Sequence, residues 1–128
     1  MATDVYTIIP GINYAKKNLK RWMSDSKRKP NFPLGLLGAK AKVSYQPLGT
    51  VGMISPWNFP VYLTFAPLSS IFAAGNQVMH KPSEYTEQTS NLLKELCDQA
   101  FDEHEFATVL GGPDVGASFT QLKFDHLL

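Results

Sequence analysis

Two short segments of the sequence hold side chains that could do chemistry. Residues 56–60 read Pro-Trp-Asn-Phe-Pro and place Asn58 inside a run, residues 43–80, that contains no Asp, Glu, Lys or Arg. The run ends at residues 81–84, Lys-Pro-Ser-Glu, where an ammonium and a carboxylate stand one turn apart. A long uncharged stretch indicates burial, so we expect chemistry at these two segments, where polar side chains interrupt or end the buried run.

The pair formed by Lys81 and Glu84 suits the two hydroxyls of a ribose, since one group donates hydrogen bonds and the other accepts them. The simpler interpretation is a local ion pair at the start of a helix. Gly111 and Gly112, followed by Pro113, carry no side chain that would block a flat ring. The chain contains neither a P-loop nor the Gly-x-Gly-x-x-Gly pattern.

The elements that must position these residues follow from hydrophobic periodicity and from Gly and Pro stops. The expected elements are an amphipathic helix over residues 13–26, a half-exposed strand over 40–46, strands over 51–55, 77–80, 106–110 and 124–128, and helices over 61–74, 86–100 and 114–122. Strands that alternate with helices at this spacing predict βαβ units and a parallel α/β sheet. The carboxyl ends of such strands meet at one edge, so residues 55–58, 81–84 and 111–114 should lie there together.

Composition and charge narrow the class of protein. The sequence is 44% hydrophobic and 18% charged, which indicates a globular domain. Residues 1–46 hold nine Lys and Arg against two Asp and Glu, and residues 47–128 hold three against nine. The basic clusters lack interleaved stacking aromatics, so we expect a solvated helix face and no nucleic-acid partner.

Membrane insertion and disulfide formation are also not expected. Prolines and glycines cut the uncharged run into pieces shorter than the roughly 20 residues that a membrane-spanning helix needs. The single cysteine, Cys97, excludes an internal disulfide and suits a reducing compartment. We therefore expect a cytoplasmic location.

Five motifs, in order and spacing, resemble the NAD(P)-dependent aldehyde dehydrogenases over about residues 12–128. They are residues 47–52 (Pro-Leu-Gly-Thr-Val-Gly), 56–60, 73–76 (Ala-Ala-Gly-Asn), 81–84 and 124–125 (Phe-Asp). The motif Lys-Pro-Ser-Glu and residues 18–23 (Asn-Leu-Lys-Arg-Trp-Met) are most similar to the branch of this family that contains the coniferyl and fatty aldehyde dehydrogenases. The resemblance implies a partial Rossmann-like sheet, βαβαβαβ, preceded by an amphipathic helix and a strand. It divides the chain into an N-terminal helix and bridging strand, residues 1–46, and an incomplete dinucleotide-binding domain, residues 47–128.

The resemblance also implies roles for single residues. Asn58 matches the family asparagine whose amide donates to the oxygen of the tetrahedral intermediate, an oxyanion-hole role. Trp57 would line the cofactor cleft, or be a core aromatic.

The cofactor would be held by Lys81 and Glu84 at the adenosine ribose, and by Gly112 and Gly116 against the adenine. Glu84 favours NAD because it repels a 2′-phosphate, whereas Lys81 could bind one, so NAD and NADP both stay open.

Catalysis in the family further requires a nucleophilic cysteine and a general-base glutamate, which lie in motifs beyond residue 128. Cys97 lies on the apolar face of an expected helix and is interpreted as a core residue. The histidines show no metal-ligand spacing.

Because the two catalytic residues are expected beyond residue 128, we expect this chain to be a portion of an enzyme that oxidises an aldehyde to a carboxylic acid. We expect the portion to be inactive alone. The alternative is a non-catalytic module that binds an adenosine nucleotide or another subunit. Because the sheet is unfinished, we expect self-association or a homo-oligomer.

Overall fold

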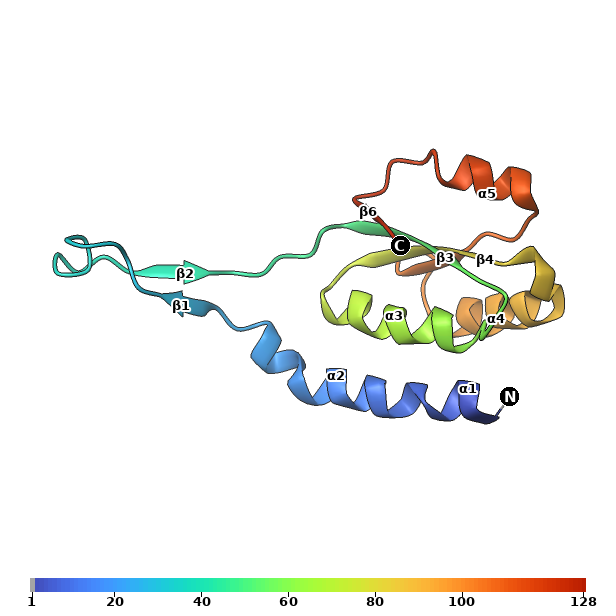
Figure 1. Ribbon diagram of the computed structural model, residues 1–128, viewed down its shortest axis with the longest axis horizontal. Helices are drawn as coiled ribbons and strands as arrows, with labels where there is room; N and C mark the ends of the chain where they lie inside the picture. Colours follow the sequence, from blue (N-terminus) through green and yellow to red (C-terminus); the bar gives the residue numbers. More distant parts are fainter. Residues whose placement is uncertain (1) are drawn as a thin grey trace.

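The computed structural model describes residues 2–128, and its centre is a four-stranded parallel sheet in the order β5-β4-β3-β6. The strands are β3 (Thr50–Ser55), β4 (Gln77–Pro82), β5 (Phe106–Thr108) and β6 (His126–Leu127). The connections contain α3 (Tyr62–Ala73), the 3₁₀ turn η1 (Glu84–Thr86) with α4 (Glu87–Ala100), and α5 (Pro113–Phe119). Helices α3 and α4 cover one face of the sheet and α5 covers the other (Figure 1). The expected parallel α/β fold is confirmed.

Strands β3 and β4 and helices α3 and α4 begin and end close to the expected residues, whereas α5 ends before the predicted residue 122. Helix α3 continues through Pro67 and stops at Gly75, whose φ of 80° is a left-handed value that glycine adopts without steric cost. The next residue, Asn76, accepts hydrogen bonds through Oδ1 from the backbone N–H groups of Leu48 and Gly49, at 2.6 and 3.0 Å. The helix stop therefore also fixes the entry to β3. The outer strands β5 and β6 are shorter than the predicted 106–110 and 124–128.

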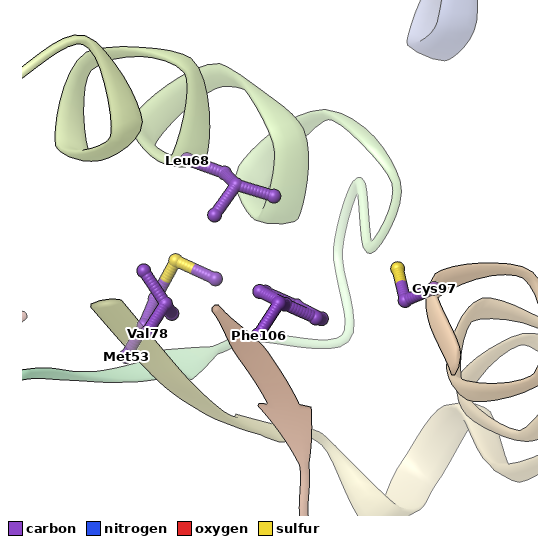
Figure 2. Close-up of a cluster of buried hydrophobic side chains, with 5 residues drawn as sticks. All are labelled: Met53, Leu68, Val78, Cys97 and Phe106. Carbon is purple, nitrogen blue, oxygen red and sulfur yellow. The ribbon is translucent and has the colours of Figure 1, made fainter. Parts of the chain in front are cut away.

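The core lies between the sheet and helices α3 and α4. Met53, Val78 and Phe106 project from three neighbouring strands toward Leu68 of α3, and Cys97 of α4 closes the cluster (Figure 2). Phe106 also packs against the rings of Phe72 and Phe101, which lie in partly buried positions beside it. The prediction that Cys97 is a core residue is confirmed.

The N-terminal helix begins earlier than predicted. Helix α1 (Ala2–Tyr6) leads into α2 (Ile8–Trp22), which packs along α3, whereas the sequence predicted one helix over 13–26. Pro10 does not prevent this start, because it lies in the first turn, where backbone N–H groups have no helical partner. Ala15 is buried on this helix.

A two-stranded antiparallel hairpin projects away from the sheet, at the left of Figure 1. It consists of β1 (Ser26–Arg28) and β2 (Ala41–Val43), so the strand predicted over 40–46 is shorter, and its partner β1 was not predicted. Asp25 accepts hydrogen bonds from Lys42 Nζ at 2.6 Å and from Ser44 at the base of the hairpin. Within the described residues, no helix has the length and apolarity needed to cross a membrane.

Candidate functional site

A cavity of about 370 Å³ opens where the carboxyl ends of β4 and β5 meet η1 and the start of α4. Its lining residues come from two of the three predicted strand ends, from the residue before one of them and from the first five residues of α4: Pro82, Ser83, Glu84, Glu87, Ser90, Asn91, Leu110, Gly111 and Gly112. The structure thus brings Glu84 and Gly112 together, as expected for one sheet edge. Ser83 belongs to the predicted segment 81–84, whereas Glu87, Ser90 and Asn91 were not predicted, although their polar types at helical spacing after the strand could have indicated them.

Glu84 lines this cavity with its carboxylate. Lys81 does not line the cavity, and its ammonium lies next to that carboxylate. The Lys81 side chain is only 3% exposed, and its Nζ donates to the Pro82 carbonyl at 2.8 Å and lies 3.5 Å from Glu84 Oε2. The Glu84 side chain keeps 33% of its surface exposed. The local ion pair is therefore present, and it leaves the carboxylate, rather than the ammonium, open to a ligand.

Hydrogen bonds at the start of α4 hold Glu84 in place. Ser83 accepts a hydrogen bond from the backbone N–H of Tyr85 at 3.3 Å, and the Ser90 hydroxyl donates to the Ser83 carbonyl at 3.0 Å. Because Ser90 is buried, this bond ties the turn to the first turn of α4. The cavity wall at this side is therefore preorganised.

The opposite wall is formed by glycines. Gly111 has a φ of 152° and packs so closely on Val115 that a Cβ at Gly111 would collide with that side chain. Gly112 caps α5, with Pro113 at the first helical position. Gly116, one turn further along α5, does not line the cavity, and the space that its Cβ would enter is open.

The third strand end carries the segment 56–60 on the surface. Trp57 is 61% exposed, so its interpretation as a core aromatic is wrong. Asn58 is exposed, and its side-chain amide has no hydrogen-bond partner among residues 2–128. Phe59, the next residue, has a φ of 70°, which is unfavourable for a residue with a Cβ. The amide of Asn58 is thus available to a ligand from a strained turn.

A buried histidine lies directly under this segment. His80 is 0% exposed, and its Nε2 lies 2.8 Å from the hydroxyl of Ser55, the last residue of β3. Burial, with a smaller contribution from the charge of Lys81, lowers the pKa of His80 from 6.5 to about 4. The imidazole is therefore neutral at neutral pH.

This pKa predicts an acid-sensitive fold. Between pH 6.5 and pH 4 the unfolded chain binds a proton at His80 that the folded chain does not, so stability falls as the pH falls through this window. The free energy of unfolding should fall by about 3 kcal/mol from this residue between pH 7 and pH 4. Urea unfolding of the chain and of His80→Gln at both pH values measures it; His104→Gln, at an exposed site, is the control. Equal losses in all three chains would contradict the prediction.

The only cysteine of the sequence does not contribute to this edge. Cys97 is 2% exposed, and burial, followed by the charge of Asp98, raises the pKa of its thiol. A buried thiol with a raised pKa is a poor nucleophile.

Comparison with known proteins identifies relatives over the whole chain. The sequence pattern of the aldehyde dehydrogenase family matches residues 1–125. A probable coniferyl aldehyde dehydrogenase of Caulobacter vibrioides is 54% identical over 127 residues, which are 98% of this chain and 26% of the relative. The coniferyl aldehyde dehydrogenase of Pseudomonas sp. strain HR199 is 49% identical over 125 residues, which are 98% of this chain and 25% of the relative. The chain thus spans about a quarter of the length of these curated relatives.

Solved structures agree with the sequence matches. The structure of Staphylococcus aureus AldH in a substrate-bound state superposes on this chain with a TM-score of 0.90 at 33% sequence identity. The superposed region is 98% of this chain and 27% of the AldH chain. The aldehyde dehydrogenase of Mycobacterium tuberculosis, complexed with NAD⁺, superposes with a TM-score of 0.70 at 26% identity, over 88% of this chain and 22% of its own.

Proposed function

The chain belongs to the aldehyde dehydrogenase family, and from this premise we propose that it is the portion of an NAD(P)-dependent aldehyde dehydrogenase that holds the adenosine of the cofactor and donates a hydrogen bond to the oxyanion. The parent reaction is oxidation of an aldehyde to a carboxylic acid. The proposal is carried by the arrangement at one edge of the sheet. There the cavity at the ends of β4 and β5, with the accessible carboxylate of Glu84, lies beside the end of β3, which is followed by Asn58 with its exposed amide.

The cavity suits the adenosine part of a nicotinamide dinucleotide. Its volume of about 370 Å³ lies within the range of small-molecule sites, roughly 300–1,000 Å³. Glu84 would accept hydrogen bonds from the ribose hydroxyls, and Gly112 would leave room for the flat adenine. Gly116 would extend that surface along α5, and Trp57 would border the cleft beyond β3. When bound, the cofactor supplies the hydride acceptor.

Glu84 also bears on the choice between NAD and NADP. Its carboxylate is the exposed charge of the pair, so it would repel a 2′-phosphate and favour NAD. Lys81 would act from below by holding this carboxylate through its buried ammonium.

Asn58 would act on the aldehyde rather than on the cofactor. As a nucleophile adds to the carbonyl carbon, the carbonyl oxygen gains negative charge, and an amide N–H aimed at that oxygen stabilises the transition state. The nucleophile would come from another part of the enzyme, because Cys97 is buried.

This assignment predicts that the 128-residue chain alone has no dehydrogenase activity. The purified chain is incubated with a panel of aldehydes and with NAD or NADP, and absorbance at the nicotinamide band follows reduced cofactor. The expected result is no reduced cofactor above the rate without protein. Steady formation of NADH or NADPH would show that the chain holds its own nucleophile.

A hybrid enzyme provides the active counterpart. In it, this chain replaces the matching 125-residue segment of the coniferyl aldehyde dehydrogenase of Pseudomonas sp. strain HR199. The rest of that relative supplies the remaining three quarters of its length. The effect of a substitution in this chain can then be measured as a change in the kcat or KM of the hybrid.

Subunit interaction is the second candidate, and the hairpin favours it. Phe32, Leu36 and Leu37 at its tip are largely exposed, and among residues 2–128 β2 pairs with β1 alone. An exposed strand edge next to apolar side chains suits pairing with a second subunit. We propose that the chain self-associates through this hairpin; a monodisperse monomer in light scattering at high protein concentration would contradict that. Calorimetry with NAD, ADP-ribose and AMP tests nucleotide binding separately.

A further inference from the structure

Three buried polar side chains form a continuous hydrogen-bonded chain beneath residues 56–60. Ser55 ends β3, His80 lies in β4 and Thr64 lies in the first turn of α3; all three are at most 2% exposed. His80 Nε2 lies 2.8 Å from Ser55 Oγ, which lies 3.3 Å from Thr64 Oγ1. Thr64 Oγ1 in turn lies 2.7 Å from the carbonyl oxygen of Pro60.

The direction of these hydrogen bonds follows from counting protons. The hydroxyl of Thr64 has one proton, and the Pro60 carbonyl can only accept, so Thr64 donates to Pro60 and must accept from Ser55. Ser55 then has no proton left for His80 and accepts from His80 Nε2–H. This assignment gives each of these three hydrogen bonds one proton, and the longer contact of 3.4 Å between His80 Nε2 and Thr64 Oγ1 agrees with it, because Thr64 can accept there as well.

The tautomer of His80 follows from the same count. Within residues 2–128, His80 Nδ1 is buried without a hydrogen-bond partner. With the proton on Nε2, Nδ1 is a bare acceptor; the other tautomer would bury an N–H without a partner and would lose the bond from Ser55 to Thr64. We therefore assign the neutral Nε2–H form.

The chain of hydrogen bonds connects strand β4 to both ends of the segment that carries Asn58. Ser55 precedes this segment in the sequence, and the Pro60 carbonyl closes it. Between them, Phe59 has a φ of 70°, a conformation that persists where the surrounding structure holds it. The Leu63 backbone N–H donates to the Phe59 carbonyl at 3.0 Å and adds a second restraint.

We propose that His80 is a positioning residue that, through Ser55 and Thr64, fixes the turn that aims the amide of Asn58. The inference rests on the proposed function of Asn58, which it deepens. His80 does not touch substrate in this account; it acts through the backbone of the turn.

The first test is nuclear magnetic resonance of the full 128-residue chain. The side-chain nitrogen shifts of His80 should show a proton on Nε2 at pH 7. His80→Leu should shift and broaden the backbone amide signals of Trp57, Asn58 and Phe59, and His80→Gln, whose amide can donate to Ser55, should return them toward their original positions. A proton on Nδ1, or unchanged turn signals in His80→Leu, would overturn the proposal.

Two further variants keep the test decisive if His80→Leu does not fold. Ser55→Ala removes the central hydroxyl with little change in volume and should shift the same turn signals. Thr108→Val is the matched control, because Thr108 pairs with His80 in the sheet register and its buried hydroxyl has no partner among residues 2–128. Turn signals that shift as much in Thr108→Val as in Ser55→Ala would also overturn the proposal.

The hybrid enzyme gives the kinetic readout. His80→Leu should lower kcat by about ten- to a hundredfold, because misplacing a transition-state donor by about 1 Å has effects of this size. The KM for NAD should stay unchanged, and His80→Gln should restore most of kcat. An unchanged kcat in His80→Leu would overturn the positioning role. Lack of activity in the hybrid with the unsubstituted chain would count against the proposed function, and the resonance experiment would still decide the role of His80.

Discussion

Asn58→Ala in the hybrid enzyme should lower kcat by about 10²- to 10³-fold, the usual effect of removing one oxyanion-hole donor. The KM for NAD should change little, because the amide acts on the oxygen of the aldehyde in the transition state and not on the cofactor. Initial rates with coniferyl aldehyde at saturating NAD measure the effect.

The Asn58 experiment has a built-in stability control. The side chain is exposed and has no hydrogen-bond partner among the described residues, so Asn58→Ala should change the free energy of unfolding by less than about 0.5 kcal/mol. Asn13→Ala, on the exposed surface of α2, is the matched substitution and should leave kcat unchanged. A kcat for Asn58→Ala within twofold of the unsubstituted hybrid would remove Asn58 from the reaction.

Glu84→Ala should raise the KM for NAD by about ten- to a hundredfold, because hydrogen bonds to a charged group contribute about 1.5–3 kcal/mol. The kcat should change little, since the ribose lies far from the reacting bond. The KM for NADP should rise less, because the variant no longer repels a 2′-phosphate. The preference of the hybrid should therefore shift toward NADP.

Two variants separate cofactor recognition from folding in this experiment. Glu84→Ala also removes the carboxylate beside the buried ammonium of Lys81, so Glu84→Gln, which keeps the shape and one acceptor, should raise the KM for NAD by a smaller factor. Glu95→Ala, on the exposed face of α4, should change neither constant. An unchanged KM for NAD in both Glu84 variants would contradict the assignment of this carboxylate to the ribose.

The parallel sheet could be predicted from the sequence because its strands are short apolar runs with clear Gly and Pro boundaries. Residues 51–55 and 77–80 are of this kind, and Gly75 and Asn76 stop the helix between them at the expected place. The hairpin could not be predicted in full. Its strand β1 (Ser26–Arg28) shows no apolar alternation, because two of its three residues, Lys27 and Arg28, are charged and exposed.

Part of the candidate site could likewise be predicted from the sequence, and part of it could not. Glu84 and Gly112 could be placed at one sheet edge because parallel topology brings strand ends together, and the structure puts both in one cavity. The role inferred for His80 could not be reached, because its partner Ser55 is 25 residues away in the sequence and the pairing depends on strand register. A histidine in a short apolar strand carries no sequence signal of what its ring contacts.

The hybrid enzyme with the unsubstituted chain tests the central claim most directly. If this chain is the cofactor-holding and oxyanion-binding portion of an aldehyde dehydrogenase, the purified hybrid should oxidise coniferyl aldehyde and reduce NAD, whereas the 128-residue chain alone should not. Circular dichroism and gel filtration establish that the hybrid is folded. A folded hybrid that reduces neither NAD nor NADP would contradict the claim.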